Sequence, residues 1–446
     1  MKRALGIAMA FIGLIVGAGF ASGQEMMQFF VAFGTMGIVG AVIASLIMTV
    51  SGIAAFQLGS YTQATEHTAV FRLVSPRAVA GFMDLVTIAT LFAIGFVMFA
   101  GGGANMAQQF DWPVWAGATL TLAAVLVAGM FDVSKVTRII GVMTPFIIVF
   151  LVGASLWSIA TADADVRMLN VAAAQVRTTL PNWWVGALNY VGLCVVTAVS
   201  MAIVMGGDVF DTRAAGVGGL LGGLLFLVLL TLSVVALFLQ VRTVGSDELP
   251  MLALVDAIHP TLGAAMSVVV FAMIFNTALG MFYALGKRLT RRRPEWFRRV
   301  YIASVLVGFG LSFIGFRELV SYVYPALGYL GLGVIVAMGA GWLRGRETMS
   351  AESARRQRLR ALATLRLDPR QEFTDRDAAE LRELSEDSNL STSDLHAIIV
   401  DRAEKALAAD PEVDYVPLPD DAEPTGILSE PGPAEGDPSG PEHSDR

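Results

Sequence analysis

The chain has 446 residues, of which 55% are hydrophobic and only 15% are charged. Soluble domains carry about 25% charged residues, so the composition argues against a cytosolic enzyme. A single cysteine excludes a disulfide framework, and the four histidines are too far apart in sequence to form a ligand-spaced metal pair. The formal charge of −7 divides into about +6 for residues 1–346 and about −13 for residues 347–446, which indicates a membrane part followed by an acidic tail.

Ten apolar segments are candidates for membrane helices, each of which needs about 20 apolar residues. They lie near residues 4–30, 35–59, 79–106, 113–131, 136–159, 183–206, 214–240, 260–286, 298–315 and 319–342. The alternation typical of a membrane β-barrel is absent. A cleaved signal peptide is an alternative for the first segment, but its apolar character resumes at Met26 and nine further spans follow. The sequence therefore predicts an all-α polytopic membrane protein.

The basic residues predict how the spans are oriented. With the N-terminus inside, about 16 lysines and arginines fall in cytoplasmic segments, and about four fall outside. The outer four are Arg167, Arg177, Arg242 and Arg317. This bias predicts a multi-pass protein of the bacterial cell (inner) membrane with both termini in the cytoplasm.

The ten spans divide into two sets of five with an offset of about 180 residues. Pro145 lies inside the fifth span and Pro325 inside the tenth. Because five is an odd number, the second set lies inverted in the membrane. We predict a 5+5 inverted repeat, with repeats over about 1–160 and 183–342 in a membrane domain of residues 1–345.

The first span is interrupted by the glycine-rich segment 17–25. Each glycine weakens a helix by about 1 kcal/mol relative to alanine. Bare peptide groups at membrane depth are tolerated only where they line a cavity or are buried in protein. We predict a break in span one and, from the repeat offset, a second and weaker break in span six near residues 197–203.

The residues from Phe11 to Glu25, followed by Phe29 and Phe30, resemble the first span of the YkvI-type family of uncharacterised bacterial membrane proteins. That family is similar to the amino acid–polyamine–organocation transporters with the leucine-transporter fold. The resemblance covers the span pattern of about residues 1–345. It implies a site at the bilayer midplane between broken spans one and six, flanked by spans three and eight, where helix N-termini suit a substrate carboxylate.

The resemblance also implies the residues of this site. For the substrate they are Gly17, Ala18, Gly19, Phe20, Ser22, Tyr190, Thr197 and Ser200. A sodium ion would lie between carbonyls of span one and the adjacent pair Asn276 and Thr277 of span eight, where asparagine departs from the two hydroxyls used elsewhere. Glu25 is the one acidic residue well inside span one and is a candidate for coupling or gating. No other cofactor is expected.

Each of these residues also has an ordinary structural interpretation. Asn276 and Thr277 are equally compatible with interhelical hydrogen bonds, and Glu25 with a backbone donor or a wet vestibule. Tyr190, Thr197 and Ser200 are equally compatible with a role in helix packing and with a role in substrate binding. The sequence alone leaves these alternatives open.

Two segments outside the spans are also predicted to be ordered. Residues 251–255, between spans seven and eight, predict a short amphipathic helix that is either an external lid or a plain interfacial helix. In the tail, residues 346–410 contain helices near 351–367 and 392–409, the second capped by Ser391 or Thr392. The tail begins with basic residues that we expect to attract anionic lipid, namely Arg355, Arg356, Arg358 and Arg360. Residues 411–446 are rich in proline, glycine and acids, which predicts disorder.

These features favour a secondary active transporter of a small solute, by fold analogy an amino acid or similar zwitterion. We expect alternating access, with spans 1, 2, 6 and 7 moving against spans 3–5 and 8–10. A sodium or proton gradient would drive it, because no nucleotide-binding motif is present. The lipid bilayer is the expected environment, and the acidic tail argues against a nucleic-acid partner.

The alternative is a membrane-embedded sensor or scaffold with the same fold, signalling through the tail to an unknown partner. Deleting residues 350–446 would abolish the function of a sensor and spare that of a transporter, whereas Gly19→Leu would do the opposite. A channel is less favoured because no span carries a ring-forming polar stripe. An intramembrane enzyme is less favoured because the spans lack a metal set or a Ser–Lys pair.

Overall fold

The computed structural model describes residues 2–64, 70, 77–130, 143–162, 165–368, 370–410 and 413, and within them every regular element is a helix. The predicted first span comprises α1 (Lys2–Ile15), α2 (Ala18–Ser22) and α3 (Gln24–Phe29), and the 3₁₀ turn η1 (Val31–Phe33) follows it. The other helices of the first half are α4 (Thr35–Thr62), α6 (Arg77–Phe110), α7 (Val114–Ala128), α9 (Met143–Thr161) and α10 (Val166–Ala173). Those of the second half are α11 (Trp183–Gly207), α12 (Thr212–Leu239), α13 (Val241–Val244), α14 (Pro250–Ile258), α15 (Pro260–Leu289), η2 (Pro294–Trp296) and α16 (Phe297–Ser312). The chain continues through α17 (Phe316–Leu367), α18 (Asp375–Glu386) and α19 (Thr392–Leu407).

Each of the ten predicted spans overlaps one or more of these helices. Within the described ranges, six helices are long and apolar enough to cross a membrane, namely α4, α6, α11, α12, α15 and α17. The apolar helices α7 and α9 are shorter, and α1 and α16 have 14 and 16 residues. The predicted start of span five at residue 136 lies outside the described residues. The count of ten crossings and the inverted pairing of the halves remain predictions.

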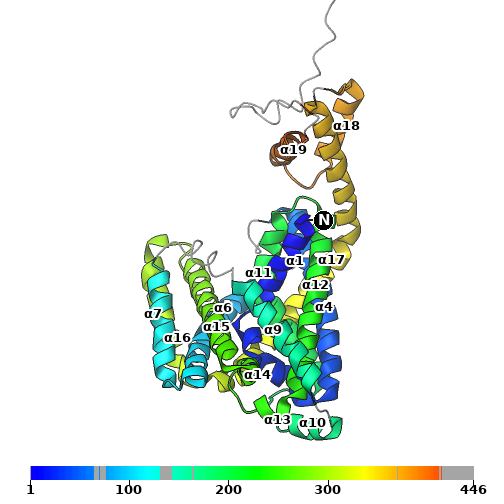
Figure 1. The fold of residues 1–446 in the computed structure, drawn as a ribbon. Helices are drawn as coiled ribbons and strands as arrows, with labels where there is room; N and C mark the ends of the chain where they lie inside the picture. Colours follow the sequence, from blue (N-terminus) through cyan, green and yellow to red (C-terminus); the bar gives the residue numbers. More distant parts are fainter. Residues whose placement is uncertain are drawn as a thin grey trace, which may run out of the picture.

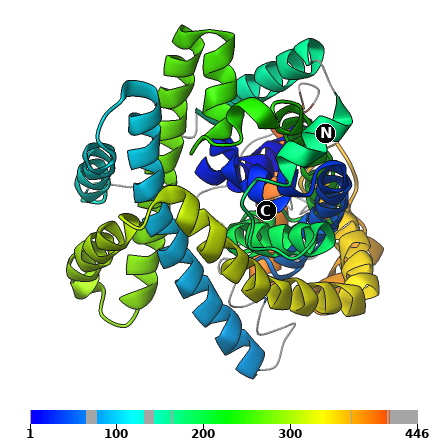
Figure 2. The ribbon, with the colours of Figure 1, turned by 90° about the horizontal axis from the view of Figure 1, so that it is seen from below.

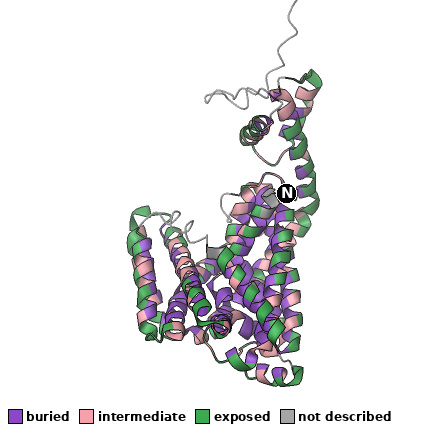
Figure 3. Ribbon diagram, viewed as in Figure 1, coloured by how far each residue is buried: buried purple, intermediate pink, exposed green. Residues whose placement is uncertain are grey.

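The helices form two packed groups. In the first group α1, α4, α11 and α12 contact one another, and in the second α6 contacts α7, α15 and α16. Figure 1 shows the second group at the left and the first at the right, and Figure 2 shows the same division from below. The short helix α2 contacts α15, so the interrupted span one lies where the groups meet. Buried residues are concentrated in the first group and on the facing sides of α6 and α15 (Figure 3).

Small residues allow the helices of the first group to approach closely. An added Cβ at Gly218 or Gly222 of α12 would meet side chains of α1, and one at Gly219 or Gly223 would meet α4. In a membrane the lipid is as apolar as the helix surface, so association depends on such close packing rather than on exclusion of water. The glycines of α12 therefore hold the first group together as packing notches.

The sixth predicted span is one continuous helix, α11, which begins after the N-cap Asn182 and runs to Gly207. The prediction of a break near residues 197–203 is therefore wrong. The Thr197 hydroxyl donates to the carbonyl of Cys194 at 2.9 Å. A hydroxyl can thus be satisfied by its own helix inside a membrane, and its presence does not require an interruption.

The tail continues the membrane part without a boundary. The predicted tenth span and the predicted tail helix 351–367 are one element, α17, which has 52 residues. Ser391 caps α19 as predicted, because its Oγ accepts from the N–H of Asp394 at 3.2 Å. The sequence analysis missed α18, which begins at a capping box formed by Thr374 and Asp377. Apart from Val413, the segment 411–446 predicted to be disordered lies outside the described residues.

The tail helices and the start of α1 lie at the same end of the molecule, called here the tail end (Figure 1). The helices α10, α13 and α14 lie at the opposite end, called here the far end. At the tail end, Arg356 is only 1% exposed, so the expectation that it faces lipid is wrong. Arg358 is instead paired with Glu380, from Nε to Oε1 at 2.6 Å, at the surface of the tail.

Candidate functional site

The first span is broken at Gly17, as predicted. Gly17 has extended backbone angles (φ −89°, ψ −171°), and its N–H donates to the carbonyl of Ile15 at 2.8 Å instead of reaching back four residues. Helical bonding resumes when the N–H of Ala21 donates to the Gly17 carbonyl at 3.0 Å. The end of one helix and the start of the next leave peptide groups without intrahelical partners. These groups lie deep within the protein.

A second bend follows at Gly23. Its φ of +82° lies in the left-handed region, which glycine adopts without steric cost. A Cβ at this position would lie 2.9 Å from the backbone nitrogen of Met251, the second residue of α14. The short helix predicted between spans seven and eight therefore exists, and it packs against the junction of α2 and α3.

A cavity of about 250 Å³ adjoins the break in span one. Its walls come from both groups of helices, including α1, α2, α3, α6, α11, α15 and α17. Most of the site residues predicted from the sequence line it, and these are Gly17, Ala18, Gly19, Glu25, Thr197, Asn276 and Thr277. The structure thus brings together residues of spans one, six and eight that are far apart in the sequence.

Among the described residues of this lining, Glu25 supplies the one carboxyl group, and none is a lysine, arginine or histidine. The carboxyl lies against Gly19, where an added Cβ would overlap it. The phenol of Tyr190 lies beside the same carboxyl. An ionised carboxylate without a cationic partner is costly in such surroundings, so the cavity is electrostatically suited to a proton or to a positively charged group.

The polar pair of α15 faces the cavity from the opposite side. Both Asn276 and Thr277 line it. The Oδ1 atom of Asn276 is buried and accepts no hydrogen bond from the part of the chain that the structure describes. Leaving a buried acceptor unsatisfied costs about 1–3 kcal/mol. This oxygen is therefore available to a ligand or an ion.

The remaining predicted residues lie outside the cavity lining. Phe20 packs on Phe226 of α12, with ring centroids 5.9 Å apart. The Ser22 hydroxyl donates to the carbonyl of Gly19 at 2.7 Å and stabilises the bend. The Tyr190 ring packs edge-on against Phe29 and Phe30, and Ser200 lies further along α11. For Phe20 and Ser22 the contacts are those of packing and capping residues.

The sequence analysis did not identify several residues that line the cavity. Ile94 and Met98 come from α6, Met281 comes from α15, and Tyr324 comes from α17. Three of these side chains are apolar and look like any other residue of a membrane helix. Tyr324 precedes Pro325, and a ring with a polar hydroxyl beside a proline inside the predicted span was the one signal available.

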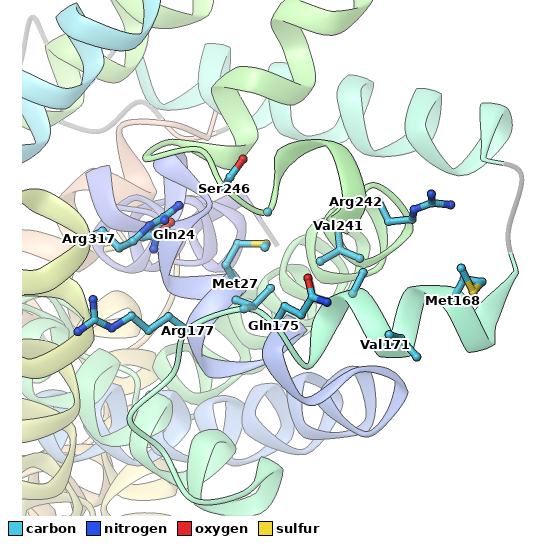
Figure 4. Close-up of a pocket in the computed structure, with 13 residues that line it drawn as sticks. Gln24, Met27, Met168, Val171, Gln175, Arg177, Val241, Arg242, Ser246 and Arg317 are labelled. Carbon is cyan, nitrogen blue, oxygen red and sulfur yellow. The ribbon is translucent and has the colours of Figure 1, made fainter.

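A larger cavity of about 500 Å³ lies at the far end and shares no lining residue with the central one. Three of the four arginines that the sequence places outside contribute to it: Arg177, Arg242 and Arg317. Figure 4 shows Arg177 and Arg317 on one side and Arg242 on the other, with Met27 and Gln175 between them. Arg177 pairs with Glu318, and Arg317 donates to the Asp247 carbonyl at 2.8 Å. The three cations do not converge on one point, and the cavity reaches span one at Gln24 and Met27 of α3 rather than at Gly17.

The fold and the site define a class: an α-helical membrane protein whose first span is interrupted beside a central cavity. No family model matches the chain. The chain is similar to the uncharacterised membrane protein YkvI of Bacillus subtilis (strain 168), with 23% identity over 336 residues, 74% of this chain and 94% of YkvI. It is also similar to the uncharacterised protein YyaD of the same organism, with 24% identity over 329 residues, 73% of this chain and 93% of YyaD. The resemblance predicted from the first span is thus confirmed.

The structure also resembles solved structures of other proteins. These include MhsT in complex with L-phenylalanine, at 13% identity and a TM-score of 0.48 over 90% of this chain and 96% of that one. Mhp1 in an inward-facing conformation matches at 13% identity and a TM-score of 0.49 over 96% of this chain and 95% of that one. A manganese transporter of Eremococcus coleocola matches at 12% identity and a TM-score of 0.48 over 91% of this chain and 92% of that one.

Proposed function

We propose that the protein is a secondary active transporter of the bacterial inner membrane that carries a small amino acid or similar zwitterion by alternating access. The observation that carries this proposal is the break at Gly17, which opens onto a cavity of about 250 Å³. Interrupted backbone at membrane depth persists only where it is buried in protein or lines a cavity. A cavity that combines freed peptide groups, one carboxyl and apolar walls is suited to a small polar solute.

The lining accommodates the two charged ends of a zwitterion separately. The Glu25 carboxylate pairs with the ammonium group of the cargo. Because the described lining has no basic side chain, the cargo carboxylate is left to the backbone N–H groups of Ala18 and Gly19 at the start of α2. Ile94 and Met98 of α6 contact the apolar part of the cargo. Each end of the cargo then meets a group of opposite charge or dipole.

Coupling to an ion gradient is assigned to the same lining. Sodium is a hard cation that prefers oxygen ligands, and the free Oδ1 of Asn276 and the hydroxyl of Thr277 are such ligands. A proton gradient would instead act through the carboxyl of Glu25, which lines the same cavity. Both modes use residues that already line the cavity.

Transport requires the two groups of helices to move relative to each other. We assign α1–α4, α11 and α12 to the moving group and α6, α7, α9 and α15–α17 to the stationary one, following the span pattern that the resemblance implies. The cavity lies between the two groups, and α9 and α17 contact helices of both. The tail end is cytoplasmic in this proposal. The basic segment 287–299 joins α15 to α16 at that end, in accord with the positive-inside rule (Figure 1).

The test is uptake of radiolabelled amino acids into proteoliposomes that contain the purified protein. Parallel reactions impose a sodium gradient, a proton gradient or neither. The proposal predicts that at least one amino acid accumulates only when one of the two gradients is present. No accumulation across a panel of neutral, acidic, basic and aromatic amino acids would contradict the proposed cargo.

A further inference from the structure

The most completely hydrogen-bonded side chain described at the tail end belongs to Arg356, on the part of α17 that extends beyond the predicted membrane span. Its guanidinium is 1% exposed. Nε donates to Glu352, Nη1 donates to the carbonyls of Ser60 and Phe210, and Nη2 donates to the carbonyl of Tyr61 and to Oδ1 of Asn389. All of these distances lie between 2.8 and 3.1 Å. The five N–H donors of the guanidinium are thus all used.

These partners come from four separate places in the chain, and together they are called the Arg356 cluster. Ser60 and Tyr61 lie in the last turn of α4, Phe210 lies in the turn between α11 and α12, and Glu352 precedes Arg356 by one helical turn. Asn389 belongs to the turn between α18 and α19, and its own Nδ2 donates to the Tyr61 carbonyl at 2.7 Å. One side chain therefore ties the tail to the ends of three membrane helices.

Further contacts reinforce the Arg356 cluster. Glu352 is also 1% exposed and accepts from Ser388 Oγ at 2.7 Å. The Phe210 ring lies 5.1 Å below the guanidinium and is buried among Leu359, Leu395 and Ile399 of the tail. A buried ion pair with all its partners is held cooperatively, because loss of one partner leaves an uncompensated buried charge.

The position of the cluster matters for movement. The helix α17 is continuous from Phe316 to Leu367, so the tail is a rigid extension of it. In the function proposed above, on which this inference rests, α17 is stationary while α4, α11 and α12 move. The Arg356 cluster therefore joins the moving and stationary groups at the cytoplasmic end. We propose that residues 347–410 are an autoinhibitory brake, and that opening of the central cavity toward the cytoplasm requires the Arg356 cluster to come apart.

The single cysteine of the chain provides a probe for this inference. Cys194 lines the central cavity and is 5% exposed. Its rate of reaction with a membrane-impermeant maleimide in inside-out vesicles measures how often the cytoplasmic path to the cavity opens. We expect Arg356→Gln to raise this rate about tenfold. Asn389→Ala removes two of the hydrogen bonds of the cluster and should raise it by a smaller factor.

The matched control is Arg358→Gln. It removes an arginine two residues away that pairs with Glu380 on the tail surface, and the labelling rate should stay at the wild-type value. Gel filtration and thermal unfolding establish that each variant is folded. If folded Arg356→Gln reacts at the wild-type rate or more slowly, the brake is refuted. If Arg356→Gln does not fold, Asn389→Ala decides the question by the same criterion.

The labelling assay needs no cargo, so its result is independent of the transport assay. Faster labelling without uptake of any tested solute would support the brake and contradict the proposed cargo. Gradient-driven uptake without faster labelling would support the transporter and refute the brake.

Discussion

Spans one and six show two ways in which a membrane helix carries polar groups into a cavity. Span one exposes its backbone, because Gly17 leaves the helix and Gly23 bends it again. Span six, α11, stays continuous and presents the hydroxyl of Thr197, which is bonded to its own helix at the Cys194 carbonyl. Both line the same cavity, and in span one the break at Gly17 leaves peptide groups without intrahelical partners.

The difference shows what breaks a membrane helix. Three closely spaced glycines each cost a helix about 1 kcal/mol relative to alanine, and they place no side chain over the exposed peptide groups. A threonine hydroxyl instead donates a hydrogen bond to a carbonyl one turn earlier, and the backbone hydrogen bonds of the helix stay in place. Gly206 and Gly207 do not interrupt α11 because the helix ends there. The following predictions test this contrast.

The largest expected effect is that of Gly19→Leu. An added Cβ at Gly19 already overlaps the Glu25 carboxyl, and a leucine would also fill part of the cavity. Displacing a binding group by about 1 Å can cost about 100-fold, so uptake should fall by at least about that factor. Radiolabelled uptake in proteoliposomes measures it.

The control for Gly19→Leu is Gly17→Ala. Gly17 lines the same cavity, its φ is negative, and a Cβ there would meet no atom within 4 Å. Uptake should stay within about twofold of the wild-type rate. An equal loss of uptake in the two variants would mean that any side chain added in this segment impairs transport. That result would contradict a specific role for Gly19.

The next effect is that of Glu25→Gln, which keeps the size of the side chain and removes its charge. A hydrogen bond to a charged group contributes about 1.5–3 kcal/mol, so the cargo concentration for half-maximal uptake should rise about 10- to 100-fold. Glu318→Gln, in the exposed ion pair with Arg177 at the far end, is the control and should change little. If the cargo concentration for half-maximal uptake is unchanged in Glu25→Gln, the Glu25 carboxyl does not bind the cargo.

Gly23→Ala should affect stability more than binding. A non-glycine residue in the left-handed region costs about 1–2 kcal/mol, and the new Cβ would also press on the backbone of Met251. We expect the free energy of unfolding in detergent to fall by at least about 1 kcal/mol, as measured by denaturant titration. A variant as stable as the wild type would show that this bend is absent in solution.

Thr197→Val should have the smallest effect. The hydroxyl is already bonded within α11, so its loss should change uptake by no more than about twofold. A loss of tenfold or more would indicate that the hydroxyl serves the cargo directly. Span six would then resemble span one more closely than its continuous helix suggests.

The sequence predicted the features that are conspicuous against an apolar background. The glycines around Gly19, the carboxyl of Glu25 and the pair Asn276 and Thr277 stand out because such groups are rare inside membrane spans. The capping role of Ser391 was also predictable, because it depends on neighbouring residues alone.

Other features depend on contacts between distant segments and left no local signal. Ile94 and Met98 line the cavity only because α6 passes beside the break in span one. Arg356 looks like a surface charge in the sequence, but it is buried because carbonyls of Ser60, Tyr61 and Phe210 converge on it. The repeat offset predicted a break in span six from spacing alone. Span six lacks the closely spaced glycines that break span one, so its helix stays continuous.

The central claim is that peptide groups are free in span one and bonded in span six. Hydrogen–deuterium exchange of the protein in lipid nanodiscs, resolved at residues 18–20 and 197–200, tests it most directly. We expect the amides of the first segment to exchange at least about 100-fold faster than those of the second, because local protection follows the free energy of opening. Equal and strong protection of both segments would contradict the account.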